Sequence, residues 1–229
     1  MKITVLGTGM VGQIIASKLE SLQHEVWVGT REVAKTLANT ENDAYGNPPF
    51  AVWYQDHSKV KLAPFAEAVG QSEGLVLNCS SGQASLKELQ TIGADLLQDK
   101  VLIDIANPLD ISQGMPPSLH PVNTNSLGET LQTAFPNLKV VKTLNTMNAH
   151  LMVNPSLIKG DHTVFVSGND EGAKATTIDL LKTFGWETSN IIDLGDISTA
   201  RGTEMLLPIW LRLYGALGTA EFNFHIQRG

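Results

Sequence analysis

The chain has 229 residues, of which 42% are hydrophobic and 17% charged, an ordinary balance for a globular protein. Its net charge of -7 argues against a nucleic-acid backbone as partner, and its single cysteine excludes an internal disulfide. The N-terminal apolar run is too short for a secretory signal, and no run reaches the ~20 residues of a membrane helix. We therefore expect a cytoplasmic protein with neither nucleic-acid nor membrane partners.

Strands and helices are expected to alternate from the first residues. A strand over residues 2–6 precedes a helix with an apolar face between Val11 and Leu22, and a strand over 25–28 precedes a helix over 32–37. The polar segment 39–58 favours an irregular packed loop over a mobile flap. That segment holds four aromatic side chains, Tyr45, Phe50, Trp53 and Tyr54.

Later strands are expected over residues 60–63, 74–78, 101–105, 140–144, 162–167 and 191–194. Leucines between 86 and 97 mark a helix, residues 108–125 form a long loop, and a capping box at Ser126 and Glu129 opens a helix that ends near Phe135. A helix over 172–184 follows, and the remainder after 194 is expected to be helical with an interruption at Pro208.

This alternation predicts an α/β fold, a doubly wound parallel sheet of the Rossmann NAD(P)-binding kind with a small, mostly helical C-terminal part. We expect residues 1–150 to form the NADP-binding domain. Residues 151–229 are expected to form an α/β extension that completes the sheet and covers the active-site cleft.

The first turn fits the pattern G-x-G-x-x-G between a strand and a helix, which is the context that this motif requires. Gly7 allows the tight turn, Gly9 lets a pyrophosphate approach the backbone, and Gly12 lets helix and strand pack closely. Free amides at the helix start would face the phosphates. The dinucleotide-binding prediction covers six consecutive residues, Gly7, Thr8, Gly9, Met10, Val11 and Gly12.

The end of the second strand indicates which dinucleotide binds. NAD enzymes place a carboxylate there for the ribose hydroxyls, whereas this chain has Thr30 and Arg31. A hydroxyl and a guanidinium suit the 2′-phosphate of NADP, and Lys35 is expected on the same face. Glu32 is the competing feature, since a shifted register would place a carboxylate nearby.

Three further strands end in small polar residues, which leave room for a flat ring. Ligands of open α/β sheets bind beyond such carboxyl ends. Helix capping, for example by Ser81 or Asn145, is the alternative explanation for part of this pattern. The residues predicted to contact cofactor here are Cys79, Ser80, Asn107, Pro108 and Asn145.

The sequence contains no Tyr-x-x-x-Lys pair, no H-E-x-x-H, no G-x-S-x-G and no Cys/His cluster, and its six histidines are scattered. We therefore assign no catalytic residue and no metal site. Hydride transfer between two redox cofactors needs little acid–base help, since the protein mainly positions the two rings.

These motifs together resemble the NADP oxidoreductases that use the deazaflavin coenzyme F-420. Members share the opening turn, a G-(S/T)-R run like that ending at Arg31, a D-x-x-N-P run like that from Asp104 to Pro108, and a K-x-x-N-T run like that from Lys142 to Thr146. A G-(D/N)-D turn after a C-terminal strand, like that from Gly168, and an Ala-Arg pair before the last helix also match. The reductase domains of six-transmembrane metalloreductases look like the same group.

The resemblance implies a small homodimeric enzyme that moves hydride between NADP(H) and a deazaflavin or flavin ring. Two other functions stay open. One is NADPH-dependent reduction of a small carbonyl or imine, with Lys142 as the nearest candidate proton donor. The other is NADP(H) sensing without turnover.

Overall fold

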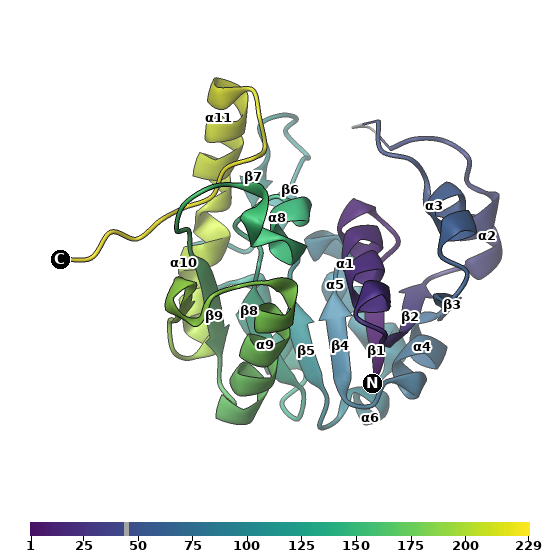
Figure 1. Cartoon of the computed structure of the whole chain (residues 1–229). Coiled ribbons are helices and arrows are strands. Elements are labelled where there is room, and N and C mark those ends of the chain that lie inside the picture. The colour runs from purple at the N-terminus through teal and green to yellow at the C-terminus, as the bar shows by residue number, and fades with distance from the viewer. Residues whose placement is uncertain (44–45) are drawn as a thin grey trace.

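The structure is a computed structural model that describes residues 1–43 and 46–229. One eight-stranded sheet runs through the molecule in the order β10-β9-β8-β5-β4-β1-β2-β3 (Figure 1). Its strands are β1 (Lys2–Leu6), β2 (Glu25–Thr30), β3 (Lys61–Pro64), β4 (Leu75–Asn78), β5 (Val101–Asp104), β8 (Lys139–Thr143), β9 (Val164–Gly168) and β10 (Ile191–Asp193). The predicted doubly wound Rossmann sheet is confirmed.

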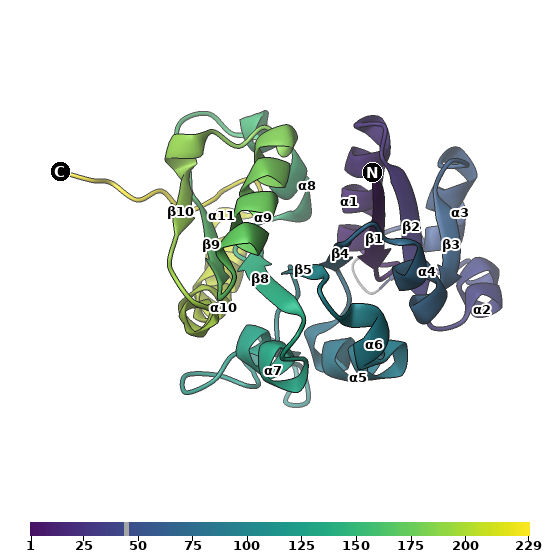
Figure 2. The ribbon, with the colours of Figure 1, turned by 90° about the horizontal axis from the view of Figure 1, so that it is seen from below.

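Helices cover both faces of the sheet, as the view from below shows (Figure 2). One face carries α1 (Met10–Ser21), α8 (Ala149–Val153) and α9 (Glu171–Phe184). The other carries α4 (Phe65–Gln71), α5 (Gly82–Ile92), α6 (Ala94–Leu97), α7 (Leu127–Ala134) and α10 (Ala200–Met205). Each face has its own apolar cluster, because the central strands are buried on both sides.

One strand pair departs from the parallel arrangement. β8 and β9 are antiparallel, with Val141 opposite Gly168, whereas β9 and β10 are parallel. The intervening α8 has five residues and spans only ~7.5 Å. It is therefore shorter than β8, whose five residues rise ~3.3 Å each, and cannot carry the chain back to the start of β8 for a parallel strand. β9 and β10 therefore end at the edge of the sheet opposite the carboxyl ends of the other strands.

Two predicted elements differ in detail. The expected helix between β4 and β5 breaks into α5 and α6 at Gly93, whose φ of +92° a helix cannot contain. The loop 108–125 holds a small antiparallel ladder of β6 (Leu109–Asp110) and β7 (Ser118–Leu119). The helix α4, directly after β3, was not predicted from the sequence.

The segment 39–58 is packed but not irregular throughout. Residues Phe50–Asp56 form α3, beside the short helix α2 (Val33–Ala38). Phe50 is buried, and Trp53 donates a hydrogen bond to the hydroxyl of Ser17 on α1. Tyr45 lies outside the described residues, so the prediction for it has no structural counterpart.

The C-terminal helix ends earlier than predicted. α11 (Leu207–Leu217) begins next to Pro208 and stops at Gly218, which adopts the left-handed conformation that commonly ends helices. Short 3-10 turns lie at Pro155–Leu157, Thr188–Asn190 and Ile197–Thr199. Residues 218–229 form no helix; Phe222 stacks on Trp210, and the Phe224 carbonyl accepts from the backbone amide of Thr163 at 2.8 Å. The last residues then leave the body (Figure 1). The expectation of a helical remainder is wrong for this tail.

Candidate functional site

The first turn has the geometry that its glycines predict. Gly7 has φ of +113°, and a Cβ there would lie 2.7 Å from the carbonyl oxygen of Cys79. A Cβ on Gly12 would lie 2.2 Å from the carbonyl oxygen of Gly7, so helix and turn pack without room for a side chain. A Cβ on Gly9 would meet nothing within 4 Å. The space outside Gly9 is open, as an approaching pyrophosphate requires.

The start of α1 supplies donors to this open space. The first amide to bond within the helix is that of Gln13, which donates to the carbonyl of Gly9 at 3.0 Å. The amides of Met10, Val11 and Gly12 precede it and have no acceptor within the helix. The Gln13 side chain donates to the carbonyl of Thr8 at 3.0 Å and stiffens the turn. Amides and helix dipole together fit the phosphates of a dinucleotide.

A cleft of about 490 Å³ opens beside the turn and extends to the end of β2. It brings together six predicted site residues, Thr8, Gly9, Met10, Thr30, Arg31 and Lys35. The other residues that line it were not predicted from the sequence. These are Gln13, Glu32, Thr36, Asn39, Glu41, Asn42, Asp43, Pro48, Pro49 and Phe50.

The cations of this cleft are exposed and the hydroxyls are not. The Arg31 side chain is 79% exposed, and its Nε lies 3.8 Å from Oε1 of the largely buried Glu88. The hydroxyl of Thr30 shares a 2.7 Å hydrogen bond with that of Thr36, so it ties the end of β2 to α2. Glu32 also lines the cleft, which keeps a carboxylate within the same space. Arg31 and Lys35 are thus the groups that can reach a 2′-phosphate.

The remaining predicted residues lie at the adjoining strand ends. Cys79 is buried, and burial, reinforced by the Asp104 carboxylate, raises the pKa of its thiol, which keeps it neutral. Asn107 and Asn145 bond to each other twice. The side-chain amide of Asn107 donates to the backbone carbonyl of Asn145 at 2.8 Å, and the side-chain amide of Asn145 donates to Oδ1 of Asn107 at 3.0 Å. The two turns are therefore held in register by side chains.

Helix capping does not explain these strand-end residues. Ser81 stands at the start of α5 without a capping hydrogen bond from its side chain. The side chain of Asn148, not Asn145, caps α8 by accepting from the amide of His150 at 2.7 Å. A Cβ on Gly82 would lie 2.2 Å from the carbonyl of Asn107, so α5 packs directly on that turn.

Lys142 cannot serve as a proton donor to a substrate. Its side chain has no solvent exposure, and its ammonium lies 2.8 Å from a carboxylate oxygen of both Asp104 and Glu204. Burial acts to lower the pKa of Lys142, but the two carboxylates outweigh it and hold the pKa above its usual value. The ammonium stays charged and enclosed.

The chain matches known proteins over its whole length. Residues 2–108 match the family model described as NADP oxidoreductase, coenzyme F-420-dependent. A protein from Arthrobacter sp. FB24, assigned as an F-420-dependent NADP reductase, is 56% identical over 100% of both chains, with a TM-score of 0.94. The chain belongs to the coenzyme F-420-dependent NADP oxidoreductase family. It is an NADP-dependent oxidoreductase.

More distant structures share the fold alone. A hypothetical protein from Sinorhizobium meliloti is 17% identical, covers 87% of both chains and has a TM-score of 0.66. An imine reductase from Aspergillus terreus, in complex with NADPH4, is also 17% identical, with a TM-score of 0.60 over 95% of this chain and 62% of that one. Within the described part of this family member, no helix is long and apolar enough to cross a bilayer.

Proposed function

We propose that the protein transfers hydride between NADPH and a deazaflavin (coenzyme F-420) or flavin ring. NADPH supplies the hydride from its nicotinamide carbon. The adenosine half would occupy the cleft beside Arg31 and Lys35, and the nicotinamide would lie near Cys79-Ser80 and Asn107-Pro108. The acceptor ring would stack there, partly covered by the loop from Asp110 to Asn125 and the C-terminal residues 151–229.

The observation that carries this proposal is the chemistry of the strand ends. Their polar side chains are already engaged: the Asn107 side chain bonds to the backbone carbonyl and the side-chain amide of Asn145, and the Lys142 ammonium is enclosed. Cys79 is a neutral, buried thiol. These groups orient a flat ring and exclude water, but none of them is placed to donate a proton. Ring-to-ring hydride transfer requires no protein acid, whereas general acid–base chemistry does.

Reduction of a carbonyl or imine is the less favoured function. It needs a proton donor at the substrate, and the one candidate predicted from the sequence, Lys142, is buried behind the Ala106 carbonyl. A sensor without turnover would show tight NADPH binding and no acceptor reduction. Supplying deazaflavin, FMN, FAD, a ketone and a cyclic imine separately while following NADPH oxidation distinguishes the three. Reduction of a ring acceptor is the expected result.

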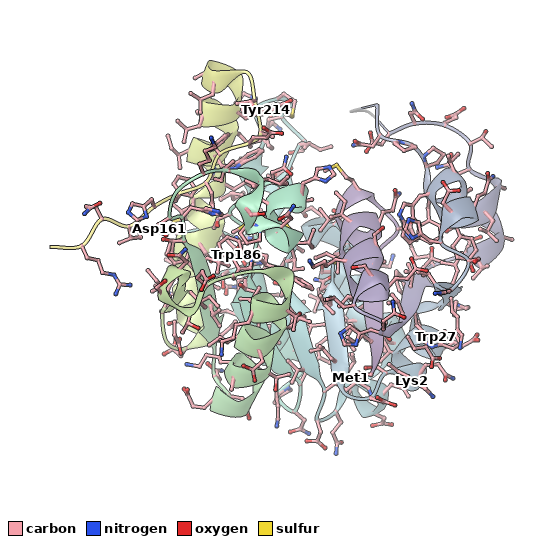
Figure 3. All side chains as sticks on the ribbon, viewed as in Figure 1. Met1, Lys2, Trp27, Asp161, Trp186 and Tyr214 are labelled. Atoms are coloured by element: carbon pink, nitrogen blue, oxygen red, sulfur yellow. The ribbon has the colours of Figure 1, made fainter. Side chains whose placement is uncertain are left out.

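A homodimer is part of the proposal. Only Leu207 of the eleven residues in α11 is buried, although the helix is mostly apolar. Ile209, Tyr214 and Leu217 are all about half exposed, and Tyr214 lies near the outer end of the helix (Figure 3). The Trp210 indole N–H is buried without a hydrogen-bond partner among the described residues. A helix that is apolar on several sides is usually covered on several sides, and a second copy of α11 supplies that cover. The cytoplasmic location stays a prediction.

A further inference from the structure

A chain of buried polar side chains runs along the carboxyl ends of three neighbouring strands. It comprises Asn78 at the end of β4, Asp104 at the end of β5 and Lys142 near the end of β8, with Ser80 and Glu204 at its two ends. We call these five residues the strand-end network. Asn78, Asp104, Lys142 and Glu204 are at most 2% exposed.

The contacts within the network are continuous. The Lys142 ammonium donates to Oδ2 of Asp104 at 2.8 Å, and the amide of Asn78 donates to Oδ1 of the same carboxylate at 2.8 Å. Oδ1 of Asn78 accepts from the hydroxyl of Ser80 at 2.8 Å. Each strand end is thereby linked to the next through side chains as well as through the sheet.

The network also hydrogen-bonds to the backbone of both turns that are proposed to hold the nicotinamide. The Lys142 ammonium donates to the carbonyl of Ala106, immediately before Asn107-Pro108. The amide of Ala106 donates to Oδ1 of Asp104 at 3.3 Å, and the amide of Ser80 donates to Oδ1 of Asn78 at the same distance. The positions of these two turns thus depend on one buried cation and its partners.

At its other end the network reaches the C-terminal helices. Glu204 lies on α10, 2.8 Å from the Lys142 ammonium, and accepts from the amides of Leu127 and Gly128 at 2.8 and 3.2 Å. Those amides open α7 and have no acceptor within that helix. The same carboxylate therefore connects α10 and α7 to the strand ends.

We propose that Lys142, with Asp104 and Glu204, is a positioning residue that fixes the nicotinamide half of the NADP(H) site and leaves the adenosine half alone. The adenosine-side cleft is lined by the first turn, the end of β2 and residues within 32–43 and 48–50, and no member of the network lines it. This inference rests on the placement of the nicotinamide in the proposed function. Since a misplacement of ~1 Å can cost about a hundredfold in rate, loosening two turns should reduce turnover strongly.

The chain offers a matched control in Lys174. Its side chain is also largely buried, and its ammonium also lies between two carboxylates, Oδ2 of Asp193 at 2.8 Å and Oε1 of Glu171 at 2.9 Å. It stands near the ends of β9 and β10, at the opposite edge of the sheet from the network. Loss of either lysine removes a cation from between two carboxylates, although the partners of Lys174 are exposed and those of Lys142 are buried. Only Lys142 contacts a turn proposed to hold the nicotinamide.

The test compares Lys142→Met and Lys174→Met with the wild-type protein by two binding measurements and by turnover. Adenosine 2′,5′-bisphosphate titrated in a calorimeter reports on the adenosine half, and the emission of bound NADPH reports on the nicotinamide alone. We expect Lys142→Met to keep the bisphosphate affinity within about twofold while the NADPH emission moves toward that of the free cofactor and turnover falls about a hundredfold. Lys174→Met should retain wild-type values in both measurements.

Several results overturn the proposal. Wild-type emission in Lys142→Met contradicts the network, and so does an equal loss of both ligands in a folded variant. If Lys142→Met does not fold, Glu204→Gln, which keeps a group able to accept from α7, must show the same selective change. A wild-type protein that binds NADPH without any change in emission contradicts the placement of the ring, and the proposed function falls with it.

Discussion

The separate roles of Gly9 and Gly12 can be tested by adding one side chain at a time. Gly9 has extended backbone angles, φ of -74° and ψ of 179°, which valine adopts without strain, and the space beyond its Cα is empty. Gly9→Val should therefore fold normally and lose dinucleotide binding. Gly12→Ala should instead destabilise the fold, since its Cβ would overlap the Gly7 carbonyl oxygen at 2.2 Å.

The structure sets the size of both effects. At position 9, replacing glycine reduces the conformational entropy of the unfolded chain, which stabilises the folded protein by ~0.4–1 kcal/mol. Valine is a poorer helix N-cap than glycine by a similar amount. The net change in the free energy of unfolding should therefore stay within about 1 kcal/mol. At position 12, overpacking typically costs ~1–3 kcal/mol. At ~2–4 °C per kcal/mol for a chain of this size, Gly12→Ala should lower Tm by roughly 2–12 °C.

NADPH affinity should fall in Gly9→Val, the variant whose stability changes little. The valine side chain would occupy the space proposed for the pyrophosphate, and loss of two charge-assisted hydrogen bonds at ~1.5–3 kcal/mol each weakens NADPH by a hundredfold or more. The assay is a calorimetric titration of NADPH alongside a thermal melt of each variant. Undiminished affinity in a folded Gly9→Val protein would show that the turn is structural only. A Gly12→Ala protein as stable as wild type would refute the packing argument.

Four further predictions concern cofactor choice, assembly, chemistry and pH. Arg31→Ala should weaken NADPH binding by roughly ten- to a hundredfold and leave NADH nearly unchanged; equal wild-type affinity for both dinucleotides would sink the 2′-phosphate assignment. Ile209→Asp on exposed α11 should convert a dimer to a monomer in light scattering, and a wild-type monomer at micromolar concentration would contradict the interface. Any single His→Ala variant should lose less than about tenfold in turnover, against the ~10²–10⁴ of general acid–base catalysis. The Arg201 hydrogen bonds lower the pKa of Glu129, so this carboxylate stabilises the fold above its unfolded pKa of ~4.3, and that contribution is lost as pH falls through the lower folded value. In urea denaturation, Glu129→Gln should accordingly have a lower free energy of unfolding than wild type near pH ~7 and the same free energy in acid. A difference in that free energy that persists unchanged in acid would contradict the pairing.

The sequence predicts the parts of the fold that depend on local pattern. Period-two and period-3.6 apolar spacing located nearly every strand and the long helices, because each buries a face. The antiparallel β8–β9 pair was not predictable, since it depends on how far the short α8 carries the chain. Likewise α3 was not predicted, because the polar, proline-containing start of its segment is typical of a loop.

The same division applies to the site. The glycine turn and Arg31 follow from a motif whose geometry is local, and both lie where they were expected. The ion pairs of Lys142 were missed because its partners are distant in sequence: Asp104 is 38 residues away, and Glu204 comes from α10. A lysine inside an apolar strand is itself a signal, since an unpaired buried charge is too costly to be retained.

The most direct test of the central proposal is the fate of a labelled hydride. The protein would be supplied with NADPH carrying deuterium at the transferable position of the nicotinamide carbon, and with oxidised deazaflavin, whose accepting atom is a carbon, in ordinary water. We predict that the reduced deazaflavin carries the deuterium in stoichiometric amount, because ring-to-ring transfer passes through no exchangeable group on the protein. NADPH that binds tightly while no ring acceptor is reduced, or a reduced deazaflavin that lacks deuterium, would contradict direct hydride transfer.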